Sequence, residues 1–117
     1  MTSDSQMLDQ NHLVFHQASF DPSWFFGDKV HAPVPYFATD HGALFQSDCL
    51  KILRQLEDDV IDTIFADPPF NLKKQYGNSF DDDLSTEEYL DWCYEWIDEC
   101  VRILKPGGAI FIYNIPK

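Results

Sequence analysis

The chain has 117 residues, of which 44% are hydrophobic and 15% aromatic, and it carries a formal net charge of −12. This length accommodates one small domain, and the apolar content suffices for a packed core, which excludes a wholly disordered chain. No run of about 18 apolar residues occurs, and the first residues are neither basic nor apolar. We therefore expect no membrane span, no membrane contact and no signal peptide.

Residues 1–40 show no sustained hydrophobic periodicity. We expect an irregular N-terminal arm whose aromatic residues, among them Trp24–Phe26, pack against another part of the protein. Residues 41–117 are expected to form a separate unit with regular secondary structure, a partial catalytic domain.

The next segments alternate between strand and helix patterns. "ALFQ" at 43–46 predicts a short strand that ends at Ser47–Asp48, and "CLKILRQL" at 49–56 has leucines at helical spacing. "VIDTIFA" at 60–66 is β-branched and apolar, which predicts a buried strand.

A polar loop is expected at 71–84, and a long helix follows it. Ser85 and Glu88 have the spacing of a capping box, in which each side chain satisfies a free backbone N–H at the start of the helix. "KPGG" at 105–108 predicts a helix stop, and 109–115 a further strand. The buried face of this helix is expected to comprise Tyr89, Cys93, Trp96, Cys100 and Leu104.

The order strand, helix, strand, loop, helix, strand indicates an α/β fold. Asp48 and Asp67 each follow a predicted strand directly. Ligands of open α/β sheets bind at the carboxyl ends of the strands, so both carboxylates are candidates for a functional site.

The turn "DPPF" after the second strand has unusual chemistry. Pro68 and Pro69 fix their own φ angles and bias the preceding residues toward extended backbone, which gives a stiff loop with free carbonyl oxygens. Asp67 and such a carbonyl can accept both hydrogens of an amino group, and Phe70 offers a face on which a planar ring can stack. These features suit methylation of an exocyclic amine on a nucleobase flipped from the duplex.

Three stretches carry a resemblance to a known family: "LFQSDCLKIL", "ADPPFNL" and "RILKPGGAIFIYN", within residues 43–116. They resemble the amino-group DNA methyltransferases that use S-adenosylmethionine, whose catalytic motif is D/N/S-P-P-Y/F/W. Asp-Pro-Pro with an aromatic resembles the adenine-N6 enzymes, whereas the cytosine-N4 enzymes more often begin the motif with serine. The motif order is similar to the β-type arrangement.

The resemblance implies a role for each residue that matches the motif. Asp67 and the Pro68 carbonyl would hold the target amine, Pro69 would complete the rigid turn, and Phe70 would stack on the base. Asp48 would contact the cofactor S-adenosylmethionine or shape its pocket. The substrate implied is double-stranded DNA with one base flipped out, in a setting that includes restriction-modification.

The sequence departs from the family in two respects. No F-x-G-x-G cofactor loop is present, and the central strands of the Rossmann-like methyltransferase sheet are not predicted. We therefore expect a partial sheet in a fragment, a truncated product or one half of a split enzyme, inactive without the remainder. Cytosine-N4 and RNA remain alternative targets. A non-catalytic acidic binding module or pseudoenzyme is an alternative of another class, favoured by the net charge of −12.

The cysteines and histidines bear on compartment and metal content. Cys49, Cys93 and Cys100 are odd in number and lack C-x-x-C spacing, which favours a reduced, cytoplasmic protein. The four histidines lack ligand spacing, so we expect no metal site.

Overall fold

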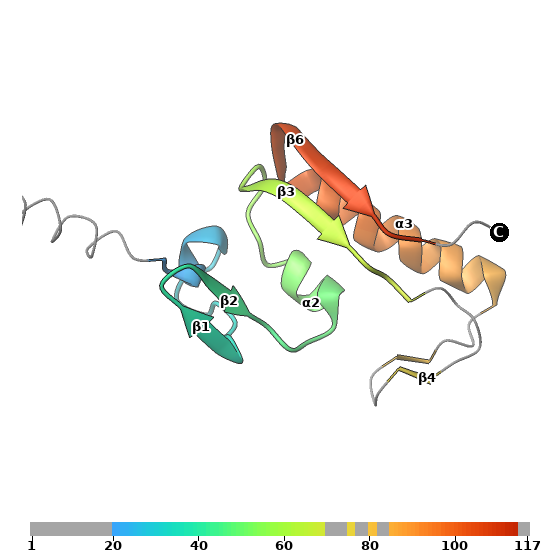
Figure 1. Ribbon diagram of the computed structural model, residues 1–117, viewed down its shortest axis with the longest axis horizontal. Helices are drawn as coiled ribbons and strands as arrows, with labels where there is room; N and C mark the ends of the chain where they lie inside the picture. Colours follow the sequence, from blue (N-terminus) through green and yellow to red (C-terminus); the bar gives the residue numbers. More distant parts are fainter. Residues whose placement is uncertain (1–19, 70–74, 77–79, 82–84, 115–117) are drawn as a thin grey trace, which may run out of the picture.

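The computed structural model describes residues 20–69, 75–76, 80–81 and 85–114 (Figure 1). The elements in chain order are η1 (Pro22–Phe25), β1 (Phe37–Thr39), β2 (Gly42–Leu44), α2 (Cys49–Leu53), β3 (Ile61–Ala66), β4 (Gln75–Tyr76), β5 (Phe80–Asp81), α3 (Thr86–Ile103) and β6 (Leu104–Ile112). Within the described residues the strands form three two-stranded sheets. The predicted mixed α/β character is confirmed.

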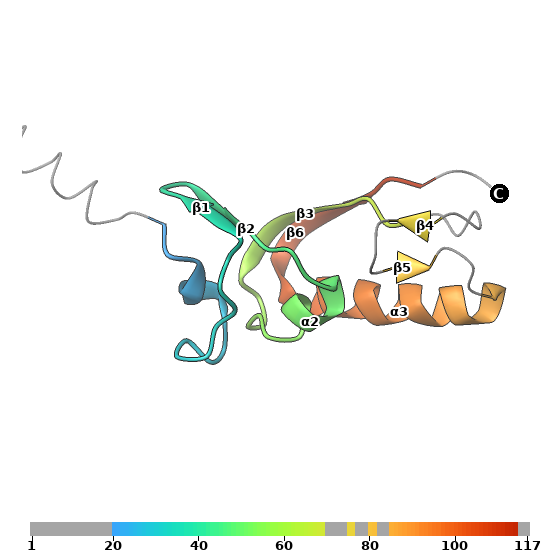
Figure 2. The same cartoon turned by 90° about the horizontal axis from the view of Figure 1, so that it is seen from below.

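The β3–β6 pair and helix α3 form the centre of the molecule. The two strands run parallel, and Ile64 pairs with Ile110 in the register. Figure 2 shows α2 and α3 on the same side of this pair. Ile64, Ala66 and Ile110 face the helices and pack against the core, because side chains alternate between the two faces of a strand.

Helix α3 begins with the predicted capping box. The Glu88 N–H donates to Ser85 Oγ at 3.1 Å, and the Ser85 N–H donates to Glu88 Oε2 at 3.4 Å. The buried residues of the helix are Tyr89, Trp96, Cys100 and Ile103. The predicted buried face is therefore confirmed at three positions, whereas Cys93 is only half-buried. At the end of the helix Ile103 is buried instead of Leu104, which caps the helix in extended conformation.

Strand β6 begins earlier than the predicted residue 109, because Leu104 already pairs with Ile61. Pairing resumes at Ala109 opposite Thr63, so the residues between form a bulge. The bulge requires glycine twice. Gly107 has a φ of +83°, and a Cβ on Gly108 would lie 2.9 Å from the carbonyl oxygen of Asp62. "KPGG" thus ends the helix and bends the strand.

We predict that Gly108→Ala lowers the free energy of unfolding by about 1–3 kcal/mol, because backbone atoms must move to admit the methyl group. Gly42→Ala is the matched control, since a Cβ there meets nothing within 4 Å. Urea unfolding followed by tryptophan fluorescence measures both variants. Equal midpoints for the two would show that the bulge tolerates a side chain.

The strand predicted at 43–46 is observed, but it lies at Gly42–Leu44 and so ends two residues earlier than predicted. The observed strand, β2, ends at Leu44 and pairs antiparallel with β1, with Phe37 opposite Leu44. A hairpin with a short turn forms from neighbouring residues, whereas a place beside β3 would require a long-range pairing. The boundary expected near residue 40 falls within this turn, and β1 lies in the arm expected to be irregular.

The described part of the N-terminal arm docks on the segment that follows α2. Phe26 is buried and forms an isolated antiparallel bridge with Leu56. The Gly27 N–H donates to the Gln55 carbonyl at 3.0 Å, and the Glu57 N–H donates to the Phe25 carbonyl at 2.9 Å. An aromatic from the arm therefore packs against the remainder of the protein, as predicted.

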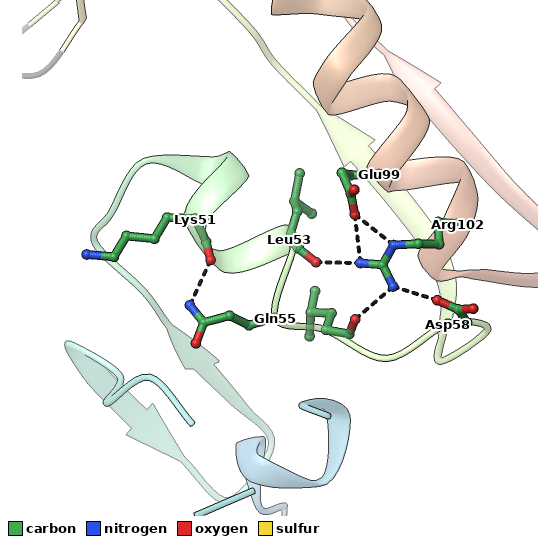
Figure 3. A network of polar contacts seen from close by, with 7 residues as sticks. Lys51, Leu53, Gln55, Asp58, Glu99 and Arg102 are labelled. Atoms are coloured by element: carbon green, nitrogen blue, oxygen red, sulfur yellow. Dashed lines mark hydrogen bonds and ion pairs between the residues drawn. The ribbon is translucent and has the colours of Figure 1, made fainter. Parts of the chain in front are cut away.

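Arg102 joins α3 to the C-terminal end of α2 (Figure 3). Its guanidinium donates to the carbonyls of Leu53 at 2.8 Å and Leu56 at 2.9 Å. It also pairs with the carboxylates of Asp58 and Glu99, each at 2.7 Å. The side-chain hydrogen bond to Asp58 is the main cause that raises the Arg102 pKa. A permanently charged donor thus binds carbonyls at the end of α2 and in the turn that follows it, in addition to the Leu56 N–H that donates to the Leu53 carbonyl at 3.1 Å.

Candidate active site

The turn at the end of β3 continues directly from the strand. The Tyr113 N–H donates to the Ala66 carbonyl at 2.9 Å, which extends the contact between β6 and β3 to the last residue of β3. Asp67 is exposed, and Pro68 and Pro69 are half-buried. The predicted location of Asp67 at the carboxyl end of a parallel strand is confirmed.

Helix α3 reaches the same turn through a buried tyrosine. Tyr89 is 6% exposed, and its hydroxyl donates to the Pro69 carbonyl at 2.7 Å. The Tyr89 ring lies 6.0 Å from Trp92 between centroids, and Trp92 lies 6.1 Å from Trp96. An aromatic row along α3 therefore runs beside the end of β3.

A cavity of about 340 Å³ opens beside this turn. Its walls come from β3, α2 and α3 and are mainly apolar. Asp67, Pro68 and Pro69 lie on its lining together with Trp92 and Trp96. The ring N–H of Trp96 is buried and has no hydrogen-bond partner among the described residues. A lining that combines aromatic side chains with a carboxylate suits a planar apolar group with polar edges.

Asp48 does not occupy its predicted place. It caps α2, where its carboxylate accepts from the Leu50 N–H at 3.2 Å, and its side chain is exposed. The strand before it belongs to another sheet than β3, so Asp48 and Asp67 do not end neighbouring strands. A short polar side chain directly before a helix is also typical of an N-cap, and Asp48 has this role in the structure.

Cys49 and Cys100 both line the cavity, and the described cysteines are free thiols. Burial is the main cause that raises the pKa of Cys100 to about 11. The pKa of Cys49 is also raised, chiefly by burial and then by the charge of Asp48. Neither thiol is therefore activated as a nucleophile at neutral pH.

The raised Cys100 pKa predicts a loss of stability in alkali. The unfolded thiol ionises near pH 9, whereas the folded thiol stays neutral to about 11. The unfolded state therefore loses its proton first, so the free energy of unfolding decreases as the pH rises from about 9 to about 11. Urea unfolding at intervals across this range measures the slope. Cys100→Ala should show a smaller slope, and an equal slope would contradict the shift.

Some predicted features lie outside the described residues or have no counterpart in them. Phe70 lies outside the described residues, as does most of the expected loop at 71–84. Among the described residues, no cluster of three or more histidine, cysteine, aspartate or glutamate side chains is arranged to hold a metal ion. No helix in the described ranges combines the length and apolarity of a membrane span.

Sequence reasoning did not identify Tyr89 as a residue of this site. Its position on the buried face of α3 was predicted, but the spacing that marks a core position carries no information about a hydroxyl partner. The contact joins residues 20 positions apart and depends on how α3 lies against β3.

Residues 61–116 match a family of DNA methylases. The match begins at β3 and includes the turn, α3 and β6. Residues 61–116 belong to the DNA methylase family. The predicted relation to amino-group DNA methyltransferases is thereby confirmed.

Curated relatives support the same assignment. The type II methyltransferase M.BamHI of Bacillus amyloliquefaciens is 60% identical over 83 residues, 71% of this chain and 20% of that protein. M.HpaI of Haemophilus parainfluenzae, also a type II methyltransferase, is 47% identical over 70 residues, 60% of this chain and 22% of that protein. The DNA adenine methyltransferase YhdJ of Escherichia coli is 33% identical over 81 residues, 67% of this chain and 26% of that protein. The chain thus spans about a fifth to a quarter of their lengths.

Proposed function

We propose that this chain contributes the amine-binding half of a DNA methyltransferase active site, and that it acts on the N6 amine of adenine. The observation that carries the proposal is the Asp67–Pro69 turn. It ends a parallel strand within the DNA methylase match, and it lies on the wall of an apolar cavity. A turn needed only to reverse the chain has no requirement for an exposed carboxylate in this position.

The proposed chemistry follows from the groups at the turn. The nitrogen of an exocyclic amine is a poor nucleophile, because its lone pair is delocalised into the ring. The Asp67 carboxylate and the Pro68 carbonyl each accept one amine hydrogen, which favours a pyramidal nitrogen with a localised lone pair. Phe70 stacks on the base after it has left the duplex. Pro69 keeps the turn rigid, so the acceptors need little reorganisation when the amine arrives.

S-adenosylmethionine is the proposed cofactor, and when bound it supplies the methyl group. We assign to Asp48 a hydrogen bond with a polar part of such a molecule, and the assignment is supported by the exposure of this residue and by the fact that one carboxylate oxygen, Oδ1, accepts the hydrogen bond that caps α2. The amine nitrogen would form the new bond to the methyl carbon as the bond between that carbon and the cofactor sulfur breaks, and the methylated amine would then release one proton. Asp67 is the adjacent group that can hold this proton.

The aspartate at the first motif position supports adenine over cytosine, and one of the relatives carries adenine methylation in its name. Cytosine-N4 is the alternative that the product analysis below distinguishes. The proposed substrate is double-stranded DNA with one base flipped out, in a restriction-modification setting like that of the type II relatives. The free thiols support a cytoplasmic location.

The net charge of −12 is unfavourable for binding the phosphates of the DNA backbone. We propose that the DNA-binding surface and the cofactor loop are supplied by sequence that corresponds to the part of the relatives not matched by this chain. The same charge favours an acidic binding module as the second candidate function. The two candidate functions make different predictions for Asp67, because only a methyltransferase requires this residue for methyl transfer.

A chimera tests the proposal. The 83-residue segment of this chain that aligns with M.BamHI replaces its counterpart in M.BamHI, and methyl transfer from labelled S-adenosylmethionine to unmethylated genomic DNA is measured. We expect incorporation of label, and digestion to nucleosides identifies the methylated base in the chimera and in parent M.BamHI analysed in parallel. N6-methyladenine found only with the chimera would support adenine as the target of these residues, whereas the same base from both proteins would assign the choice of base to the remainder of M.BamHI and leave the proposed amine chemistry intact. An inactive chimera that still binds DNA would favour the acidic module.

A further inference from the structure

We propose that Tyr89 is a positioning residue for the amine-binding turn. This inference rests on the proposed function, because it assigns a task to a contact within the same site. The Tyr89 hydroxyl donates to the Pro69 carbonyl at 2.7 Å, and the side chain is 6% exposed. A short hydrogen bond from a buried donor restrains the direction of the acceptor carbonyl, because solvent has little access to the donor.

Tyr89 is held by a well-defined helix start. It lies one turn after the N-cap Ser85, and its own N–H donates to the Ser85 carbonyl at 2.9 Å. The capping box between Ser85 and Glu88 fixes the first turn of the helix. The Tyr89 side chain is therefore attached to a helix turn whose backbone is held by these hydrogen bonds.

Neighbouring rings restrict the rotation of the phenol. Trp92 packs 6.0 Å from Tyr89, and Trp96 continues the row into the core, where it is 4% exposed. Trp92 and Trp96 also line the cavity beside the turn. Tyr89 thus lies at the end of an aromatic row whose other two members line the cavity.

The turn is held at both of its ends. At one end the Tyr113 N–H donates to the Ala66 carbonyl at 2.9 Å, and at the other end Tyr89 donates to Pro69. Between these points lie Asp67 and Pro68, and the proline rings fix φ at 68 and 69. Proline also biases each preceding residue toward extended geometry, so few backbone rotations remain free. The positions of the Asp67 carboxylate and the Pro68 carbonyl follow from these restraints.

Tyr89 therefore acts on turnover through the placement of two acceptors and touches neither substrate nor cofactor itself. Misplacement of a reacting group by about 1 Å can cost about a hundredfold in rate. Loss of the hydroxyl should lower kcat, because the acceptors no longer match the pyramidal amine. The KM values for S-adenosylmethionine and DNA should stay within about twofold, because the Tyr89 hydroxyl contributes nothing to the binding of either molecule before the reaction.

The first measurement examines the hydrogen bond in the 117-residue chain. Proline labelled with ¹³C at the carbonyl is incorporated, and the Pro69 signal is assigned with Pro69→Ala. Tyr89→Phe should move this signal upfield, since a carbonyl that loses a donor is less deshielded. Tyr94→Phe is the matched control, because Tyr94 lies on the same helix and is 65% exposed. An unchanged Pro69 signal in Tyr89→Phe would overturn the inference.

The second measurement uses the chimera described above with the same two variants. Tyr89→Phe should lower kcat about tenfold to a hundredfold with little change in KM, whereas Tyr94→Phe should match the parent. Unfolding midpoints separate this effect from a loss of folded protein. A normal kcat for Tyr89→Phe, while Asp67→Ala abolishes turnover, overturns the inference alone. Retained turnover in Asp67→Ala overturns the proposed function, and the carbonyl signal then decides only whether the hydrogen bond exists.

Discussion

Asp67→Ala in the chimera is expected to lower kcat for methyl transfer by about 10²–10⁴-fold, the range typical for loss of a positioned acid–base group or a preorganised polar contact. The alanine removes both the acceptor for one amine hydrogen and the group that can hold the released proton. Binding of S-adenosylmethionine should remain measurable by calorimetry, because Asp67 is not assigned to the cofactor. Asp67→Asn should retain more turnover than alanine, since the amide keeps one carbonyl oxygen.

The matched control for this variant is Asp62→Ala. Asp62 is also on the β3 segment, and its side chain is 81% exposed and paired with Lys105 at 3.0 Å. Because this pair is at the surface and Asp62 lies near the start of β3, at the opposite end of the strand from the turn, its loss should change neither kcat nor KM appreciably. Equal effects of the two substitutions would mean that charge on β3, and not the turn, governs the rate. Full turnover in Asp67→Ala would remove Asp67 from catalysis.

Arg102→Met is expected to lower the free energy of unfolding by about 2–4 kcal/mol. The methionine keeps much of the aliphatic packing but leaves the Leu53 and Leu56 carbonyls without their charged donor. Hydrogen bonds to charged groups each contribute about 1.5–3 kcal/mol, and partial exposure of the guanidinium reduces their sum. Urea unfolding of the 117-residue chain measures the loss.

Arg54→Met provides the comparison for this second variant. Arg54 makes an ion pair with Glu95 at 2.9 Å, but both side chains are more than half exposed. Surface pairs of this kind contribute about 0–1 kcal/mol. Arg102→Lys should be intermediate, because an ammonium group lacks the planar fork that reaches several acceptors at once. A cost for Arg102→Met no larger than that for Arg54→Met would contradict the role assigned to the network.

The features that the sequence predicted well are encoded locally. The capping box at Ser85, the helical spacing through Cys100 and the apolar run before Asp67 each depend on residues within a few positions of one another. The same holds for the turn itself, since two prolines restrict the backbone whatever surrounds them. These features suffice to give the β3–α3–β6 unit and the location of the motif.

The features that were missed depend on partners distant in the chain. The partner of β2 could not be read from its own residues, because a three-residue strand fits a hairpin or a sheet edge equally well. The hydrogen bond from Tyr89 to Pro69 and the contacts of Arg102 with Leu53 likewise require the packing of α3 to be known. Asp48 was misplaced for the same reason, since an acid after a short apolar stretch also fits a helix cap.

The face of the β3–β6 pair turned away from α3 has a consequence for biosynthesis. Phe65 and Phe111 are opposite each other in the register and are 73% and 56% exposed. The unit that carries them is contiguous in sequence, so it can fold as soon as α3 and β6 have left the ribosome. From that moment two phenylalanine rings face the solvent. Exposed apolar surface of this kind makes a partly folded chain prone to aggregation, so we expect the two rings to raise the risk of association between nascent chains.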